Sequence, residues 1–80
     1  MPRLRRCSGM ALVAALQQRG FVVERQRGSH IKLVRPIPAG RQVLIIPNHQ
    51  LLDTGTIRAI ARQAGKYLTD EEVQNIFYAE

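Results

Sequence analysis

The pair Gly28-Ser29 is the feature that most restricts how this chain can fold, because it joins two runs of residues with strand character. Residues 24–27 precede the pair and residues 30–35 follow it. Glycine adopts a positive φ without steric cost, as the tight turn of a β-hairpin requires. The sequence therefore predicts a hairpin with its bend at Gly28 and Ser29.

The second run of this hairpin alternates between apolar and polar side chains. Ile31 and Leu33 fall on one face of the strand, whereas His30 and Lys32 fall on the other. If helices cover the apolar face, His30 and Lys32 point into solvent together. Glu24, on the preceding run, is expected to be a cross-strand partner of Lys32, and a role in orienting His30 is the alternative.

Apolar residues with helical spacing predict a helix on each side of the hairpin. Ser8 is suited to cap a first helix that ends at Gly20. A threonine within residues 54–56 is expected to cap a second helix that ends at Gly65. A short third helix is also expected near the end of the chain. The residues of the three helices that are expected to face the core are Leu12, Val13, Leu16, Ile57, Ile60, Ala61, Ala64, Val73, Ile76 and Phe77.

Three further segments complete the predicted fold. Residues 36–40, rich in proline, read as a loop because proline cannot donate to a strand ladder, and residues 42–46 read as a third strand. Thr69 and Glu72 have the spacing of a capping box, which predicts a short third helix. The resulting order is helix, three antiparallel strands, helix and short helix. This is an α+β fold with helices on one face of the sheet, the topology of the double-stranded-RNA-binding fold.

Length and composition limit the possible functions. The 80 residues are enough for one small core, so we expect a single domain over residues 1–80, with residues 1–7 as a basic arm that is either disordered or in contact with phosphate. Cys7 is the only cysteine, which excludes an internal disulfide. Cys7, His30 and His49 lack the short spacing of metal ligands, so we expect no metal or other cofactor. No export signal or apolar span of about 20 residues is visible, so we expect no membrane association and a cytoplasmic location.

The charge of the chain is unevenly distributed. The formal net charge is +6, and nine Lys and Arg residues face one Glu in residues 1–52, whereas residues 53–80 have a small acidic excess. Such a basic surface favours a polyanionic partner, and a surface charge that only maintains solubility is the alternative. Contact with phosphate is therefore expected in the first two thirds of the chain.

The residues around the turn suit the cleavage of RNA. RNA carries its own nucleophile, the 2′-hydroxyl, so cleavage needs a proton acceptor, a proton donor and cations near the phosphate. An imidazole exchanges a proton near neutral pH, so we interpret His30 as a general base or acid in a reaction without metal. The second proton transfer falls to His49 or to water. The residues expected to contact RNA are Arg25, Arg27, Gly28, Ser29, Lys32, Arg35 and His49.

Three other functions are consistent with the same sequence. An RNA-binding module without catalysis would share the fold and the charge and need no histidine. A helix-turn-helix DNA binder is possible over residues 56–78, but three carboxylates, in residues 70–72, oppose contact with phosphate, so we expect no sequence-specific DNA binding. An adaptor could bind another protein through the apolar residues 43–46.

Five short motifs follow one another along the chain: Gly20-Phe21, Arg25-Gln26-Arg27-Gly28-Ser29-His30, Ile46-Pro47-Asn48-His49, Gly55-Thr56-Ile57-Arg58 and Ala64-Gly65. In this order they resemble the HicA (YcfA-like) family of mRNA interferase toxins. The resemblance implies a ribosome-independent ribonuclease with a double-stranded-RNA-binding-like fold, mRNA as its substrate and a HicB-type antitoxin as its partner. It also implies that His30 is the catalytic histidine. The chain departs from the family pattern at residues 36–40 and 50–53, and the second departure puts RNA contact by His49 in doubt.

Overall fold

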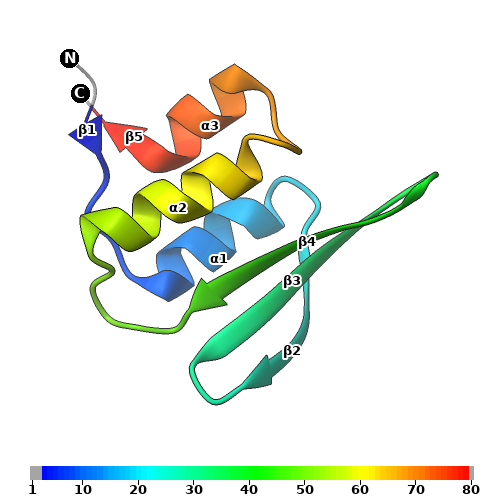
Figure 1. The fold of residues 1–80 in the computed structure, drawn as a ribbon, viewed down its shortest axis with the longest axis horizontal. Helices are drawn as coiled ribbons and strands as arrows, with labels where there is room; N and C mark the ends of the chain where they lie inside the picture. The colour runs from blue at the N-terminus through cyan, green and yellow to red at the C-terminus, as the bar shows by residue number, and fades with distance from the viewer. Residues whose placement is uncertain (1–2, 80) are drawn as a thin grey trace.

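The computed structural model describes residues 3–79, and in that part of the chain it contains three helices and two antiparallel sheets (Figure 1). In chain order the elements are β1 (Arg3–Leu4), α1 (Gly9–Gln17), β2 (Val22–Arg27), β3 (His30–Ile37), β4 (Gly40–Pro47), α2 (Thr54–Ala64), α3 (Asp70–Phe77) and β5 (Tyr78–Ala79).

The larger sheet has the strand order β2-β3-β4, with both pairs of neighbours antiparallel. Helices α1 and α2 pack against β4, and α3 packs on these two helices. Figure 1 shows all three helices on one side of the sheet, while the long hairpin of β3 and β4 projects beyond them. The predicted α+β fold, with a three-stranded antiparallel sheet and helices on one face, is confirmed.

The core lies between this sheet and the helices. Ile31 and Leu33 of β3 are buried, as predicted, and Leu44 and Ile46 of β4 lie beside them in the same cluster. Removing these four aliphatic side chains from water stabilises the fold in proportion to the apolar area that they bury. The helices and their flanks contribute Leu12, Val13, Leu16, Phe21, Leu52, Ile57, Ile60, Ala61, Ala64, Leu68, Ile76 and Phe77, with Val73 partly buried against them.

Two of the three predicted helix starts are confirmed. The Ser8 hydroxyl accepts a hydrogen bond from the backbone of α1, and Thr69 and Glu72 form a reciprocal capping box at α3. The second helix differs from the prediction, because Asp53 is its N-cap. The Asp53 carboxylate accepts a hydrogen bond from the backbone N–H of Thr56 at 2.8 Å, so the helix begins at Thr54. An aspartate satisfies the free N–H groups of a first turn as well as a threonine does.

Residues 36–40 are not the loop that their prolines predicted. Strand β3 continues to Ile37 and β4 begins at Gly40, and Pro36 lies opposite Arg41 in the ladder. Strand β2 begins only at Val22, opposite Val34, so Pro36 has a neighbouring strand on one side only. A proline is tolerated at such an edge because its missing N–H has no carbonyl to bond there.

The smaller sheet was not predicted. Strand β1 pairs with β5, with Arg3 opposite Ala79 and Leu4 opposite Tyr78. Part of the predicted basic arm is thus paired with β5, and Figure 1 shows β1 and β5 side by side. Met1 and Pro2 of that arm lie outside the described residues. Two-residue strands carry no periodicity that a sequence pattern can reveal.

Candidate active site

The open face of the larger sheet contains a shallow hollow of about 250 Å³. It is lined by Arg25 and Arg27 of β2, His30 and Lys32 of β3, and Ile45 of β4. Two of these residues precede the β2–β3 turn, two follow it, and Ile45 follows the next turn. The pairing of the three strands brings all five onto one surface. Four of them are predicted site residues, and Ile45 is an addition.

The register of the sheet explains this convergence. Arg27 lies opposite His30, and Arg25 lies opposite Lys32, in the pairing of β2 with β3. Directly opposed side chains in an antiparallel pair have Cβ atoms about 5 Å apart and point to the same face. Ile45 of β4 lies opposite Lys32 on the other side of β3. His30, which is exposed, therefore has Arg27 as its cross-strand neighbour on the open face.

A bulge in β2 decides which face the two arginines occupy. The register shifts by one residue between Val23 and Arg25, so Glu24 is the extra residue. Without this shift, Arg25 would lie opposite Ile31 and share the core-facing side of the sheet. The bulge thus leaves both arginines, Arg25 and Arg27, on the same face of the sheet as His30. Its position could not be read from the alternation of residue types.

Glu24 forms ion pairs with two cations on the same face. Its carboxylate lies 3.1 Å from the Lys32 ammonium and 2.6 Å from the Arg41 guanidinium. The hydrogen bond from Lys32, and then that from Arg41, lower the pKa of Glu24. The predicted partnership of Glu24 with Lys32 is confirmed. Lys32 is consequently held by a carboxylate, and Arg41 is a cation of this surface that sequence reasoning missed.

The turn before His30 has the predicted conformation. Gly28 has φ +58°, and no atom lies near the position of an added Cβ, so the requirement at Gly28 is conformational. The carbonyl of Ser29 accepts a hydrogen bond from the backbone N–H of Asn48 at 2.6 Å. This bond attaches the turn to the segment that follows β4, which fixes the start of β3 where His30 lies.

His49 lies on the same connecting segment but does not line the hollow. Its backbone N–H donates to the Pro47 carbonyl, and its own carbonyl accepts from the Gly9 N–H at 2.9 Å. A Cβ on Gly9 would overlap the Pro47 carbonyl oxygen, so only glycine allows this close approach of α1. The pKa of Asp53, at the start of α2, is lowered first by the Thr56 N–H and to a smaller extent by Arg6 and His49. His49 therefore lies near the start of α2 and outside the hollow that contains His30.

Arg35 is separated from the other predicted site residues. It lies on the helix-covered side of β3, with its guanidinium carbon 4.8 Å from the centre of the Phe21 ring. Its nitrogen atoms donate to the Gln42 side chain at 2.7 Å and to the carbonyls of Arg19 and Tyr67 at 2.8 Å each. These bonds use the guanidinium to connect β3 with the helix layer. We therefore omit Arg35, which was predicted to contact RNA, from the proposed RNA surface.

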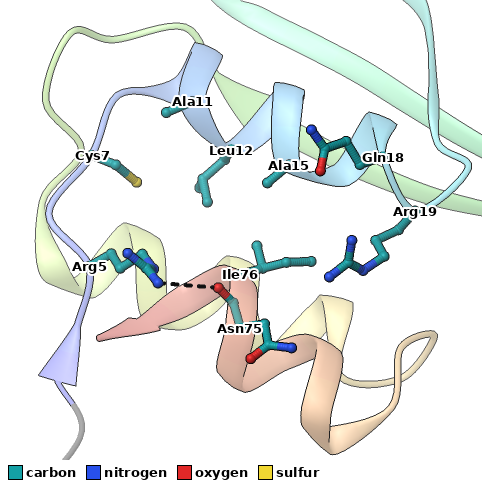
Figure 2. Close-up of a pocket in the computed structure, with 9 residues that line it drawn as sticks. All are labelled: Arg5, Cys7, Ala11, Leu12, Ala15, Gln18, Arg19, Asn75 and Ile76. Carbon is teal, nitrogen blue, oxygen red and sulfur yellow. Dashed lines mark hydrogen bonds between the residues drawn. The ribbon is translucent and has the colours of Figure 1, made fainter. Parts of the chain in front are cut away.

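A second cavity, of about 260 Å³, lies between α1 and α3 (Figure 2). The Arg5 side chain points across it and donates to the Asn75 carbonyl at 3.4 Å. Arg19, at another part of its rim, lies 3.4 Å from the Glu72 carboxylate. Burial raises the pKa of the Cys7 thiol in this cavity, which keeps the thiol protonated. Both arginines of this cavity already bond to groups of α3, so the hollow on the sheet is the better candidate for an active site.

Neither a membrane span nor a cluster of metal ligands is found among residues 3–79. None of the helices in this range is long and apolar enough to cross a membrane. His, Cys, Asp and Glu side chains do not gather there in groups of three or more with the geometry of a metal site.

Comparison with known protein families gives one match. The family model described as "HicA toxin of bacterial toxin-antitoxin" matches residues 9–66, more than half of the chain. The matched region runs from the first residue of α1 to just beyond α2, so it includes the whole hollow. No curated protein matches the chain.

Proposed function

The chain belongs to the HicA toxin family, toxins of bacterial toxin–antitoxin systems, and from this premise we propose that it is an endoribonuclease that cleaves mRNA without a metal ion. The observation that carries this proposal is the position of His30. Its imidazole is exposed at the edge of a hollow that also contains Arg25, Arg27 and Lys32. This combination of one proton-transfer group with several cations suits attack on a phosphodiester.

The proposed reaction uses the 2′-hydroxyl of the RNA as its nucleophile. The imidazole of His30 accepts the proton of that hydroxyl, and the oxygen forms a bond to the adjacent phosphorus. The bond from phosphorus to the 5′-oxygen breaks, and water supplies the proton that the leaving oxygen takes up. The products are a 2′,3′-cyclic phosphate on one fragment and a 5′-hydroxyl on the other. Water takes this second role because His49 lies outside the hollow.

The arginines of β2 are the proposed phosphate ligands. Arg27 lies opposite His30 in the ladder, and Arg25 lies one pair further along the same face. A guanidinium offers two parallel N–H donors to phosphate oxygens and stabilises the negative charge that develops on them. Lys32 contributes less, because Glu24 already neutralises it. Gly28 and Ser29 are proposed to let the RNA backbone approach the turn.

A HicB-type antitoxin is the proposed partner, and the cytoplasm, where mRNA is translated, is the proposed location. Exposed apolar side chains border the cations of the open face, with Ile45 at 47% and Val22 at 55% exposure. Apolar patches rimmed by charge are typical of protein-binding surfaces. A partner that covers Ile45 would also block access of RNA to His30.

The reaction class is tested by comparing RNA and DNA of the same sequence in the presence of EDTA. We expect the purified protein to cleave the RNA and to leave the DNA intact, since DNA lacks the 2′-hydroxyl. The RNA fragments should carry cyclic phosphate and 5′-hydroxyl ends. Binding of RNA without cleavage would instead favour a non-catalytic RNA-binding module, a function consistent with the single imidazole in the hollow.

A further inference from the structure

A second basic cavity lies at the chain termini, away from the open sheet face. It has a volume of about 450 Å³ and is lined by Arg3, Leu4, Arg6, Thr54, Arg58 and Tyr78. We call it the arginine pocket. Its three arginines come from β1, from the segment that follows β1 and from α2, so the fold gathers cations that are far apart in the sequence.

Backbone pairing holds the arginine pocket together. Leu4 lies opposite Tyr78 in the small sheet, and the backbone N–H of Arg5 donates to the Phe77 carbonyl at 2.8 Å. Strand β1 packs against α2, where Thr54 and Arg58 are four residues apart and therefore share one face of the helix. The pocket is consequently built by ordered backbone and not by a free arm.

The three guanidinium groups lack carboxylate partners among residues 3–79. The ion pairs described for this part of the chain involve Arg19, Lys32 and Arg41 instead. The pKa of Asp53, the residue before the pocket residue Thr54, is lowered first by the Thr56 N–H and to a smaller extent by the charge of Arg6. Placing three cations around one cavity costs electrostatic repulsion, which a bound anion relieves.

We propose that the arginine pocket binds phosphodiester groups of the same RNA strand that is cleaved at His30. This inference rests on the proposed function. Guanidinium groups provide paired N–H donors that match phosphate oxygens, and the hydroxyls of Thr54 and Tyr78 add donors at the same cavity. Such contacts do not depend on base identity, so the pocket positions the strand and contributes affinity rather than sequence preference.

The segment of the chain between β4 and α2 connects the two sites, so a single extended RNA strand can contact both. The segment between β4 and α2 is bonded to the turn at one end, through the Asn48 N–H and the Ser29 carbonyl. At the other end it is bonded to the N-terminal segment, through the Leu52 N–H and the Cys7 carbonyl at 2.9 Å. Asn48 and Leu52 are at most about 15 Å apart, given the reach of extended chain. In Figure 1 the β2–β3 turn lies at the lower edge and α2 begins at the left edge, and the segment that follows β4 runs to the start of α2.

The test measures RNA affinity in a protein that cannot cleave. In the His30→Ala background, a fluorescently labelled single-stranded RNA is titrated at several salt concentrations with three further variants. These are Arg58→Ala, Arg3→Ala with Arg58→Ala, and the control Arg62→Ala, an exposed arginine of α2 that does not line the pocket. Circular dichroism is used to check that each variant is folded. Arg58 is exposed on α2, so the single variant Arg58→Ala still tests the pocket if the double variant unfolds.

We expect the double variant to bind RNA on the order of tenfold more weakly, with the slope of log affinity against log salt reduced by about 1 to 2. Arg58→Ala should show roughly half of this change in slope and Arg62→Ala very little. The proposal is overturned if all variants bind RNA with equal affinity, which is also the result expected if the pocket binds an acidic protein. It is likewise overturned if Arg62→Ala loses as much affinity as Arg58→Ala. Cleavage of RNA by the protein with His30 intact is measured separately. If that protein cleaves RNA but the pocket variants bind RNA normally, this inference is contradicted and the proposed function is not.

Discussion

His30 occupies the first position of β3, directly after the turn, and this placement follows from a few neighbouring residues. A glycine at position 28 with φ +58° and a two-residue turn fix Arg27 opposite His30, as the sequence indicated. The faces of Ile31 and Lys32 were also predictable from alternation. The ion pairs of Glu24 with Lys32 and Arg41 were only partly predictable, because the position of Arg41 depends on the full length of the β3–β4 hairpin.

At the same scale, Glu24 is expected to limit the affinity of the surface for RNA. Replacing Glu24 by Gln removes the carboxylate that holds Lys32 and Arg41, so both cations become available to phosphate. We expect tighter RNA binding by Glu24→Gln, with a log–log salt slope steeper by about 1. The measurement is a salt titration of RNA binding in the His30→Ala background. Unchanged or weaker binding would show that Glu24 does not compete with phosphate.

At the scale of the elements, helix and strand positions were predictable and their ends were less so. Periodic apolar residues located α1, α2 and α3, and the capping box located the start of α3. The bulge at Glu24 and the continuation of β3 through Pro36 were not predictable, since both depend on which strand lies alongside. The prediction that Arg35 contacts RNA rested on its charge, whereas its side chain bonds to groups in the helix layer.

Arg35 is expected to stabilise the fold by connecting β3 with the helix layer. The change Arg35→Ala removes three hydrogen bonds and leaves the carbonyls of Arg19 and Tyr67 without their donor. We expect the free energy of unfolding to fall by about 3 kcal/mol, because hydrogen bonds from charged groups are among the stronger ones. Urea unfolding measures this value, and Arg62→Ala, on an exposed helix surface, should change it by less than about 0.5 kcal/mol. A similar small change for Arg35→Ala would contradict the structural role.

At the scale of the whole molecule, the sequence alone predicted which part of the chain carries the basic surface. The basic excess in residues 1–52 supplies the cations of the open face and two of the three arginines of the arginine pocket. The pairing of the two ends of the chain, which completes that pocket, was beyond reach from sequence. Contacts between residues so distant in the chain, such as Leu4 and Tyr78, leave no local pattern.

Three carboxylates make the stability of the molecule sensitive to acid. The pKa values of Glu24, Asp53 and Glu72 are lowered in the folded state, by the hydrogen bond from Lys32, by the Thr56 N–H and by the Thr69 N–H respectively. A lowered folded pKa means that the stabilisation is fully present above the unfolded pKa and is lost as pH falls through the folded pKa. We expect a melting temperature that is nearly constant from pH 7 to pH 5 and decreases below about pH 4.

Thermal melts followed by circular dichroism across this pH range measure that dependence. Glu72→Gln is the matched variant, because it removes one titrating group and should reduce the slope below about pH 4. A melting temperature that stays constant or rises on acidification would show that these hydrogen bonds and ion pairs contribute nothing to the folded state.

Cleavage of RNA by the His30→Ala variant, compared with the unchanged protein and with Arg62→Ala, is the most direct test of the account as a whole. His30 is exposed and outside the core, so its removal should leave the melting temperature nearly unchanged. Loss of general base catalysis should reduce the cleavage rate by about 10² to 10⁴, while Arg62→Ala cleaves at the normal rate. A folded His30→Ala protein that cleaves RNA as fast as the unchanged chain would contradict the assignment of the active site.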